Sequence, residues 1–140
     1  MKKIMEDLKD ILIKSIYSDV KAKDYFLSNL CNETLFVDLI NIVRNSDSDD
    51  ARMEAAFYIS QFDTKIITKS EAELLLLMDD ELDSIAVHIM VALSRIKSPL
   101  ALKKIINERI KPDMYWEACA LENYFGEDIY GTENNKSCMD

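Results

Sequence analysis

The sequence predicts an all-α fold, a short α-solenoid of paired helices that begins with an N-terminal helical cap. The chain of 140 residues has only two Gly and two Pro, and it is 49% hydrophobic and 31% charged, a composition typical of helical proteins rather than of sandwiches or barrels. Apolar residues recur at helical spacing along most of the chain. The stretch 46–106 also holds two passes of one pattern, in which an acidic turn opens a long apolar helix and a shorter helix follows.

Residues 1–45 predict three helices that cover one end of the array. Helical spacing of apolar residues indicates a first helix over 3–17, and Ser18 is a candidate cap for a second helix over about 19–30. Asn32 is the expected N-cap of a third helix. Stacked helical units need such a cap, because no unit can bury its own apolar face.

The first of the two passes runs from the acidic turn at Ser46 to Phe62, breaks, and continues as a shorter helix over 70–77. Ser70 and Glu73 have the spacing of a capping box, which marks the start of that shorter helix.

The second pass starts at Asp79 and reaches Ile96, and its shorter helix follows Ser98-Pro99, a cap residue before Pro at the first helical position. A third, half-length pass covers 113–126. We therefore expect seven or eight helices.

These passes resemble HEAT-like repeats. Arg52 and the pair Ala55-Ala56 precede Phe62 as in the family pattern Arg-x-x-Ala-Ala-x-x-Leu-(Gly)-x-Ile, and the run from Ala92 to Leu102 is similar to Ala-Leu-Gly-x-Ile-x-Asp-Pro-x-Ala-Leu. The sequence departs from the pattern where Ser94 replaces the usual Gly, and where the family Arg is Ala86 in the second pass and Tyr115 in the third. The resemblance covers about 46–126 and implies a helical-repeat fold without indicating a function.

The resulting domain prediction is a single helical-repeat domain over 1–126, with 1–45 as the cap and 46–126 as the repeats. After Gly126 the sequence becomes polar and acidic, with few apolar groups that could dock on the domain. We expect residues 127–140 to form a flexible tail.

Charge is unevenly distributed along the chain. Residues 1–31 carry six Lys against five Asp/Glu, a net charge of +1, whereas residues 32–140 carry 11 Lys/Arg against 21 Asp/Glu, a net charge of −10. An acidic body repels phosphate backbones and anionic lipid and attracts basic proteins. We therefore expect a basic protein partner, and neither nucleic acid nor a membrane.

Catalytic and metal-binding patterns are missing from the sequence. His88 is the only histidine, and there is no Gly-rich phosphate loop, nucleophile elbow or His/Cys cluster. We expect no enzymatic activity, no catalytic residue, no cofactor and no metal, and we interpret His88 as an ordinary surface or interface residue. The three Cys lack metal-ligand spacing, and the N-terminus lacks the apolar core of a signal peptide, so we expect reduced thiols and a cytoplasmic location.

Acidic residues open each long helix. Stacked repeats would bring equivalent turns side by side, so these acids should form one edge of the array. One or two carboxylates per helix start are ordinary, since each gains roughly 0.3–1 kcal/mol from the helix dipole, but the four acids at 79–83 exceed that use. We therefore expect this edge to bind a partner, together with exposed aromatic anchors and two tail acids. The predicted partner-binding residues are Asp49, Asp50, Asp79, Asp80, Glu81, Asp83, Phe57, Tyr115, Trp116, Glu127 and Asp128, with Tyr58 as a further exposed aromatic.

Two classes of function fit these observations. In size, acidity, helical build and lack of enzyme parts, the chain resembles in type the immunity proteins that bacteria keep in their cytoplasm against contact-dependent growth inhibition toxins. That resemblance implies a cognate toxin domain as partner, often a basic nuclease, and it makes a protein-binding inhibitor the favoured hypothesis. The alternative is a HEAT-like adaptor or scaffold module. HEAT-built DNA glycosylases and bilin lyases are disfavoured, because the former need a basic groove and both are longer.

Overall fold

The structure is a computed structural model that describes residues 2–80, 82–109 and 115–126. Within these residues every regular element is helical, which confirms the expected all-α fold. The predicted tail over 127–140 lies outside the described residues. In chain order the elements are α1 (Lys2–Ile16), α2 (Val20–Leu27), α3 (Glu33–Asn45), α4 (Asp49–Ile59), α5 (Thr64–Lys69), α6 (Glu71–Leu77), α7 (Asp83–Arg95), α8 (Pro99–Lys104), the π-helical turn η1 (Ile105–Arg109) and α9 (Tyr115–Phe125).

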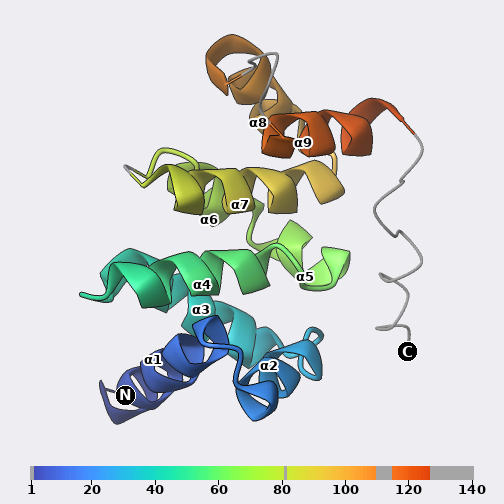
Figure 1. Cartoon of the computed structure of the whole chain (residues 1–140). Coiled ribbons are helices and arrows are strands. Elements are labelled where there is room, and N and C mark those ends of the chain that lie inside the picture. Colours follow the sequence, from blue (N-terminus) through green and yellow to red (C-terminus); the bar gives the residue numbers. More distant parts are fainter. Residues whose placement is uncertain (1, 81, 110–114, 127–140) are drawn as a thin grey trace.

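The helices α4, α7 and α9 form successive layers. Figure 1 shows them as roughly parallel rungs, one above the other, with α1 and α2 below α4. Helix α3 packs on α4, α4 on α7, and α7 on α9, while α1 also packs against α4. A helix that packs between two neighbours needs small or apolar side chains on both of the faces that contact them. In α4 this requirement is met by Ala51, Ala55 and Ala56, which are all fully buried.

One hydrophobic cluster extends through these layers. Phe26 of α2 stacks on Tyr58 of α4 with ring centroids 4.4 Å apart, and Phe36 of α3 meets Phe62 edge-on at 4.9 Å. The cluster continues to Ala120 of α9. Tyr58 is only 1% exposed, so its predicted exposure is wrong. The reason is that α1, α2 and α4 converge on its ring, a contact between segments that are distant in sequence.

Several helix starts follow the local sequence signals. The Asn32 side chain accepts a hydrogen bond from the Leu35 N–H at 3.0 Å, and Ser98 Oγ accepts one from the Ala101 N–H at 3.3 Å, which confirms both as N-caps. The cap of α2 is Asp19 rather than Ser18, because Asp19 Oδ1 accepts from the Ala22 N–H at 2.9 Å. Ser18 instead adopts a left-handed backbone conformation, with φ of 67°.

The break expected after Phe62 contains the additional helix α5. Asp63 caps it by accepting a hydrogen bond from the Lys65 N–H at 3.1 Å, and its residues Ile66 and Ile67 are buried. This short segment therefore contributes to the core rather than acting as a plain connection.

The capping box predicted at the start of α6 is wrong. Ser70 makes no side-chain cap hydrogen bond, and the Glu73 carboxylate accepts a hydrogen bond from Arg44 of α3 at 3.1 Å. Glu73 therefore binds a side chain of another helix instead of capping the start of its own.

The expectation of reduced thiols is confirmed at one of the two cysteines that the structure describes and is wrong at the other. Cys119 is a free, buried thiol, whereas Cys31 is disulfide-bonded. Cysteine spacing carries no information about tertiary neighbours, which is why the sequence pattern did not indicate this bond. None of the helices in the described part of the chain is long and apolar enough to cross a membrane.

Candidate functional site: an acidic and aromatic groove

Asp80 does not present a free carboxylate at the expected acidic edge. Its carboxylate pairs with the guanidinium of Arg52, and the two side chains are only 11% and 16% exposed. The same carboxylate accepts a hydrogen bond from the Leu82 N–H at 2.9 Å, next to the start of α7. Arg52 in turn donates to the Val43 carbonyl at 2.7 Å. These contacts tie the end of α3 and the start of α4 to the turn before α7.

The other predicted acids that the structure describes are more exposed, and Asp79 and Asp49 form pairs within the chain. Asp79, with its side chain 62% exposed, binds Lys104 Nζ at 2.7 Å, and Asp49 lies 3.4 Å from Arg52 Nη1. Asp50 and Asp83 are exposed. The acids at helix starts thus include pairs that join different helices, which accounts for part of the charge that caps alone do not explain. Glu81, Glu127 and Asp128 lie outside the described residues.

Aromatic rings form a continuous row across α4, α7 and α9. Phe57 contacts His88 edge-on at 5.6 Å between ring centroids, and His88 contacts Trp116 at 5.3 Å. Trp116 contacts Tyr115 at 5.0 Å. Tyr115 is 58% and Trp116 39% exposed, while Phe57 is half-buried. Three predicted anchors are thus brought together by a histidine that the sequence analysis interpreted as an ordinary residue.

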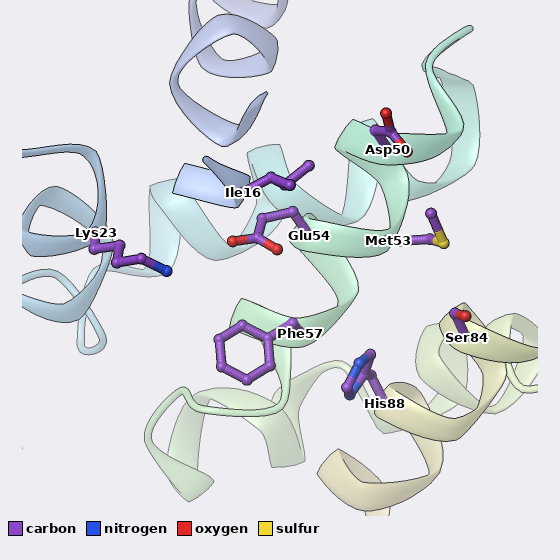
Figure 2. A pocket seen from close by; sticks show the side chains of 8 residues that line it. All are labelled: Ile16, Lys23, Asp50, Met53, Glu54, Phe57, Ser84 and His88. Carbon is purple, nitrogen blue, oxygen red and sulfur yellow. The ribbon is translucent and has the colours of Figure 1, made fainter. Parts of the chain in front are cut away.

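A groove of about 460 Å³ lies beside the first two rings of this row, as Figure 2 shows. Its wall on α4 consists of side chains at positions 50, 53, 54 and 57, a spacing that places them on one face of a helix. Helix α7 contributes two side chains one turn apart, and the end of α1 and helix α2 contribute one each. The lining residues are Ile16, Lys23, Asp50, Met53, Glu54, Phe57, Ser84 and His88.

The Glu54 carboxylate is held in place by a buried serine of α1. Ser15 Oγ of α1 donates a hydrogen bond to Glu54 Oε2 at 2.7 Å, and it lies 2.6 Å from the Tyr58 hydroxyl. Since the single Ser15 proton points to Glu54, the Tyr58 hydroxyl is the donor in the second bond. Burial raises the pKa of Tyr58, and the nearby Glu54 charge adds to that effect, so this donor stays protonated. Glu54 therefore has a fixed position with its carboxylate toward the groove (Figure 2).

His88 is uncharged in the groove wall at neutral pH. Burial lowers its pKa below the usual 6.5, because the imidazolium form loses hydration there. A neutral ring between Phe57 and Trp116 extends the aromatic surface without adding positive charge. The groove then carries two carboxylates, Asp50 and Glu54, against the single ammonium of Lys23.

Sequence reasoning found Asp50 and Phe57 but missed the rest of the groove. The spacing of Asp50, Met53, Glu54 and Phe57 could have indicated a common helix face. No local pattern could have shown that α2 and α7 bring Lys23 and His88 to the same place. Among the described residues, no three His, Cys, Asp or Glu side chains gather in a way that could hold a metal ion.

No family model matches this chain, and the comparisons with curated proteins and with solved structures give no match either.

Proposed function

We propose that this chain is a non-enzymatic inhibitor that binds a basic protein and neutralises it. The observation that carries the proposal is the aromatic row Phe57–His88–Trp116–Tyr115, which runs across three helices beside a groove with two carboxylates. Aromatic residues are enriched where proteins bind each other, and a few of them dominate the binding energy. The net charge of −9 favours a basic partner, since complementary charge speeds encounter.

The partner that fits this chemistry is a toxin domain with a basic catalytic surface, such as a nuclease. In this proposal the chain is an immunity protein of the contact-dependent growth inhibition type, built as a short HEAT-like α-solenoid with residues 1–45 as its cap. In this proposal it acts in the cytoplasm.

The test begins with co-purification of the chain from its native host, followed by growth measurements. Cells that produce the partner identified in this way, without this chain, should stop growing. Cells that produce both proteins should grow. Growth arrest that persists although the two proteins bind would exclude the inhibitor function and favour the adaptor or scaffold alternative.

A pair of variants on α9 locates the interface. Trp116→Ala removes a ring of the aromatic row and should weaken binding of the partner about tenfold or more, as expected for an aromatic anchor. Phe125→Ala removes a 71% exposed ring from the same helix outside the row and is the matched control. Equal affinities of the two variants, measured by calorimetry, would exclude the aromatic row as the binding surface.

A further inference from the structure

The groove beside the aromatic row has the volume of a small-ligand pocket, which is enough to hold a single side chain. Pockets that bind small ligands typically span about 300–1,000 Å³, and this groove of about 460 Å³ lies within that range. It is an open groove between α1, α2, α4 and α7, so an occupant can enter it from solvent (Figure 2).

The carboxylates and the aromatic rings that line the groove are suited to bind a planar cation. Figure 2 shows the Glu54 carboxylate directed into the space between Lys23 and Phe57, with Asp50 one turn away on α4. The ring of Phe57 and the ring of His88 form the adjacent wall. A cation above an aromatic ring and beside carboxylates is stabilised by both contacts.

We propose that this groove receives an arginine side chain of the basic protein partner. This inference rests on the proposed function and specifies the chemistry of its binding site. Arginine fits better than lysine, because the planar guanidinium can stack on Phe57 while its N–H groups reach the carboxylate of Glu54 one turn away, and the charge of Asp50 adds attraction from the next turn of α4. Glu54 is already oriented by Ser15, so little freedom is lost when the guanidinium binds.

Lys23 gives the proposal a prediction of opposite sign. Its ammonium lines the same groove and repels an incoming guanidinium. Removal of this charge should tighten arginine binding, whereas removal of either carboxylate should weaken it. A site that simply responds to a looser or damaged fold would lose affinity in all three cases.

The experiment is an NMR titration of the full chain at low salt with the peptide acetyl-Gly-Arg-Gly-amide. The control peptide contains citrulline, which has nearly the shape of arginine but no charge. We expect amide shifts centred on Asp50, Glu54, Phe57 and His88 with the arginine peptide, and none with the citrulline peptide. Equal shifts with citrulline, or shifts spread over every exposed carboxylate, would overturn the proposal. Equal affinity for the corresponding lysine peptide would overturn the assignment to arginine.

Four variants complete the test. Asp50→Asn and Glu54→Gln should each weaken binding of the arginine peptide about threefold, and Lys23→Gln should strengthen it about threefold, as expected for partly exposed charges. Glu54→Gln keeps an oxygen that can accept the Ser15 hydrogen bond. Asp24→Asn removes one negative charge, as the two groove carboxylate variants do, but at an exposed position outside the groove. It should leave the affinity unchanged. Equal affinities of all four variants would contradict the proposal.

Failure of this inference can be distinguished from failure of the proposed function. If the chain neutralises its purified partner, and the Glu54→Gln variant binds the arginine peptide more weakly but the partner as tightly as before, the inference fails while the function stands. If the groove binds the arginine peptide but the chain protects no cell from its partner, the inhibitor function fails while the arginine site stands.

Discussion

Arg52 of α4 binds the carboxylate of Asp80, which lies in the turn before α7. The pair is largely buried and joins two successive layers of the stack, and Arg52 reaches the end of α3 as well through the Val43 carbonyl. This ion pair fixes the position of α4 relative to α7. If the two side chains separated, neither buried charge could be hydrated in place of its partner. The groove depends on that relation, since its walls come from both α4 and α7.

The first prediction concerns the stability of this junction. Asp80→Ala leaves the buried Arg52 guanidinium without its main counter-charge and should lower the free energy of unfolding by about 3 kcal/mol. Asp79→Ala is the matched control, because the neighbouring Asp79 binds Lys104 with its side chain 62% exposed and should cost less than about 1 kcal/mol. Urea unfolding followed by circular dichroism gives both values. Similar losses for the two variants would contradict a structural role that is special to Asp80.

The second prediction concerns acid sensitivity and His88. Its pKa is lowered by burial from the usual 6.5, so the unfolded chain binds a proton at this site at a higher pH than the folded chain does. The stabilising effect of the neutral form is therefore complete above the unfolded pKa and is lost as the pH falls from about 6.5 toward the lower folded value, with a slope of at most about 1.4 kcal/mol per pH unit.

The variant His88→Phe tests this assignment. It keeps a ring against Phe57 and Trp116 but has no proton to gain, so its free energy of unfolding should change less between about pH 7.5 and pH 5.5 than that of the unmodified chain. Urea unfolding at the two pH values measures the difference. The same loss of stability in both proteins would assign the acid sensitivity to other groups.

The third prediction concerns alkaline pH and Tyr124. Its hydroxyl donates a hydrogen bond to the Ser98 carbonyl at 2.7 Å, and burial, with a further contribution from the Glu71 charge, raises its pKa to about 12. Because the folded pKa lies above the unfolded value of about 10, the neutral phenol stabilises the fold below that pH, and the effect is lost as the pH rises from about 10 through 12. Absorbance of tyrosinate should show a late titration that is smaller by one tyrosine in Tyr124→Phe, where Tyr58, whose pKa is also raised by burial, still titrates late.

The same variant should also lose stability at neutral pH. Tyr124→Phe removes the hydrogen bond to Ser98 and leaves a carbonyl with one partner fewer, which should cost about 1 kcal/mol. Tyr17→Phe is the control, since Tyr17 is 76% exposed and its replacement should change the free energy of unfolding at pH 7 by less than about 0.5 kcal/mol. A late titration of unchanged amplitude in Tyr124→Phe would show that Tyr124 does not contribute to it.

Parts of the fold could be predicted because they depend on neighbours in sequence. Asn32 and Ser98 mark helix starts through contacts to backbone groups three residues away, and Pro99 fits the first helical position because it has no N–H to lose. The structure confirms these starts. The same local reasoning failed at Ser70, because Glu73 binds Arg44 from another helix. It also missed α5, whose Ile66 and Ile67 are stabilised by tertiary burial rather than by a long periodic pattern.

The candidate site shows the same division. The sequence predicted acids and aromatic rings as partner-binding residues, and of these Asp50, Phe57, Tyr115 and Trp116 lie on the groove or in the aromatic row. It could not distinguish Asp80 from its neighbours, because a carboxylate that binds Arg52 and one that faces solvent look alike in a string of acids.

The sequence by itself determined that the chain is helical and acidic, since helical periodicity and net charge are properties of residues close together or of the whole composition. Only the tertiary structure decided which carboxylates form ion pairs with Arg52 and Lys104 and which aromatic rings are in contact. It also decided that Lys23, Glu54 and His88 line one groove. The physical reason is that these relations depend on how α1, α2, α4 and α7 are placed against each other, and that placement follows from burial of the whole core rather than from any local spacing.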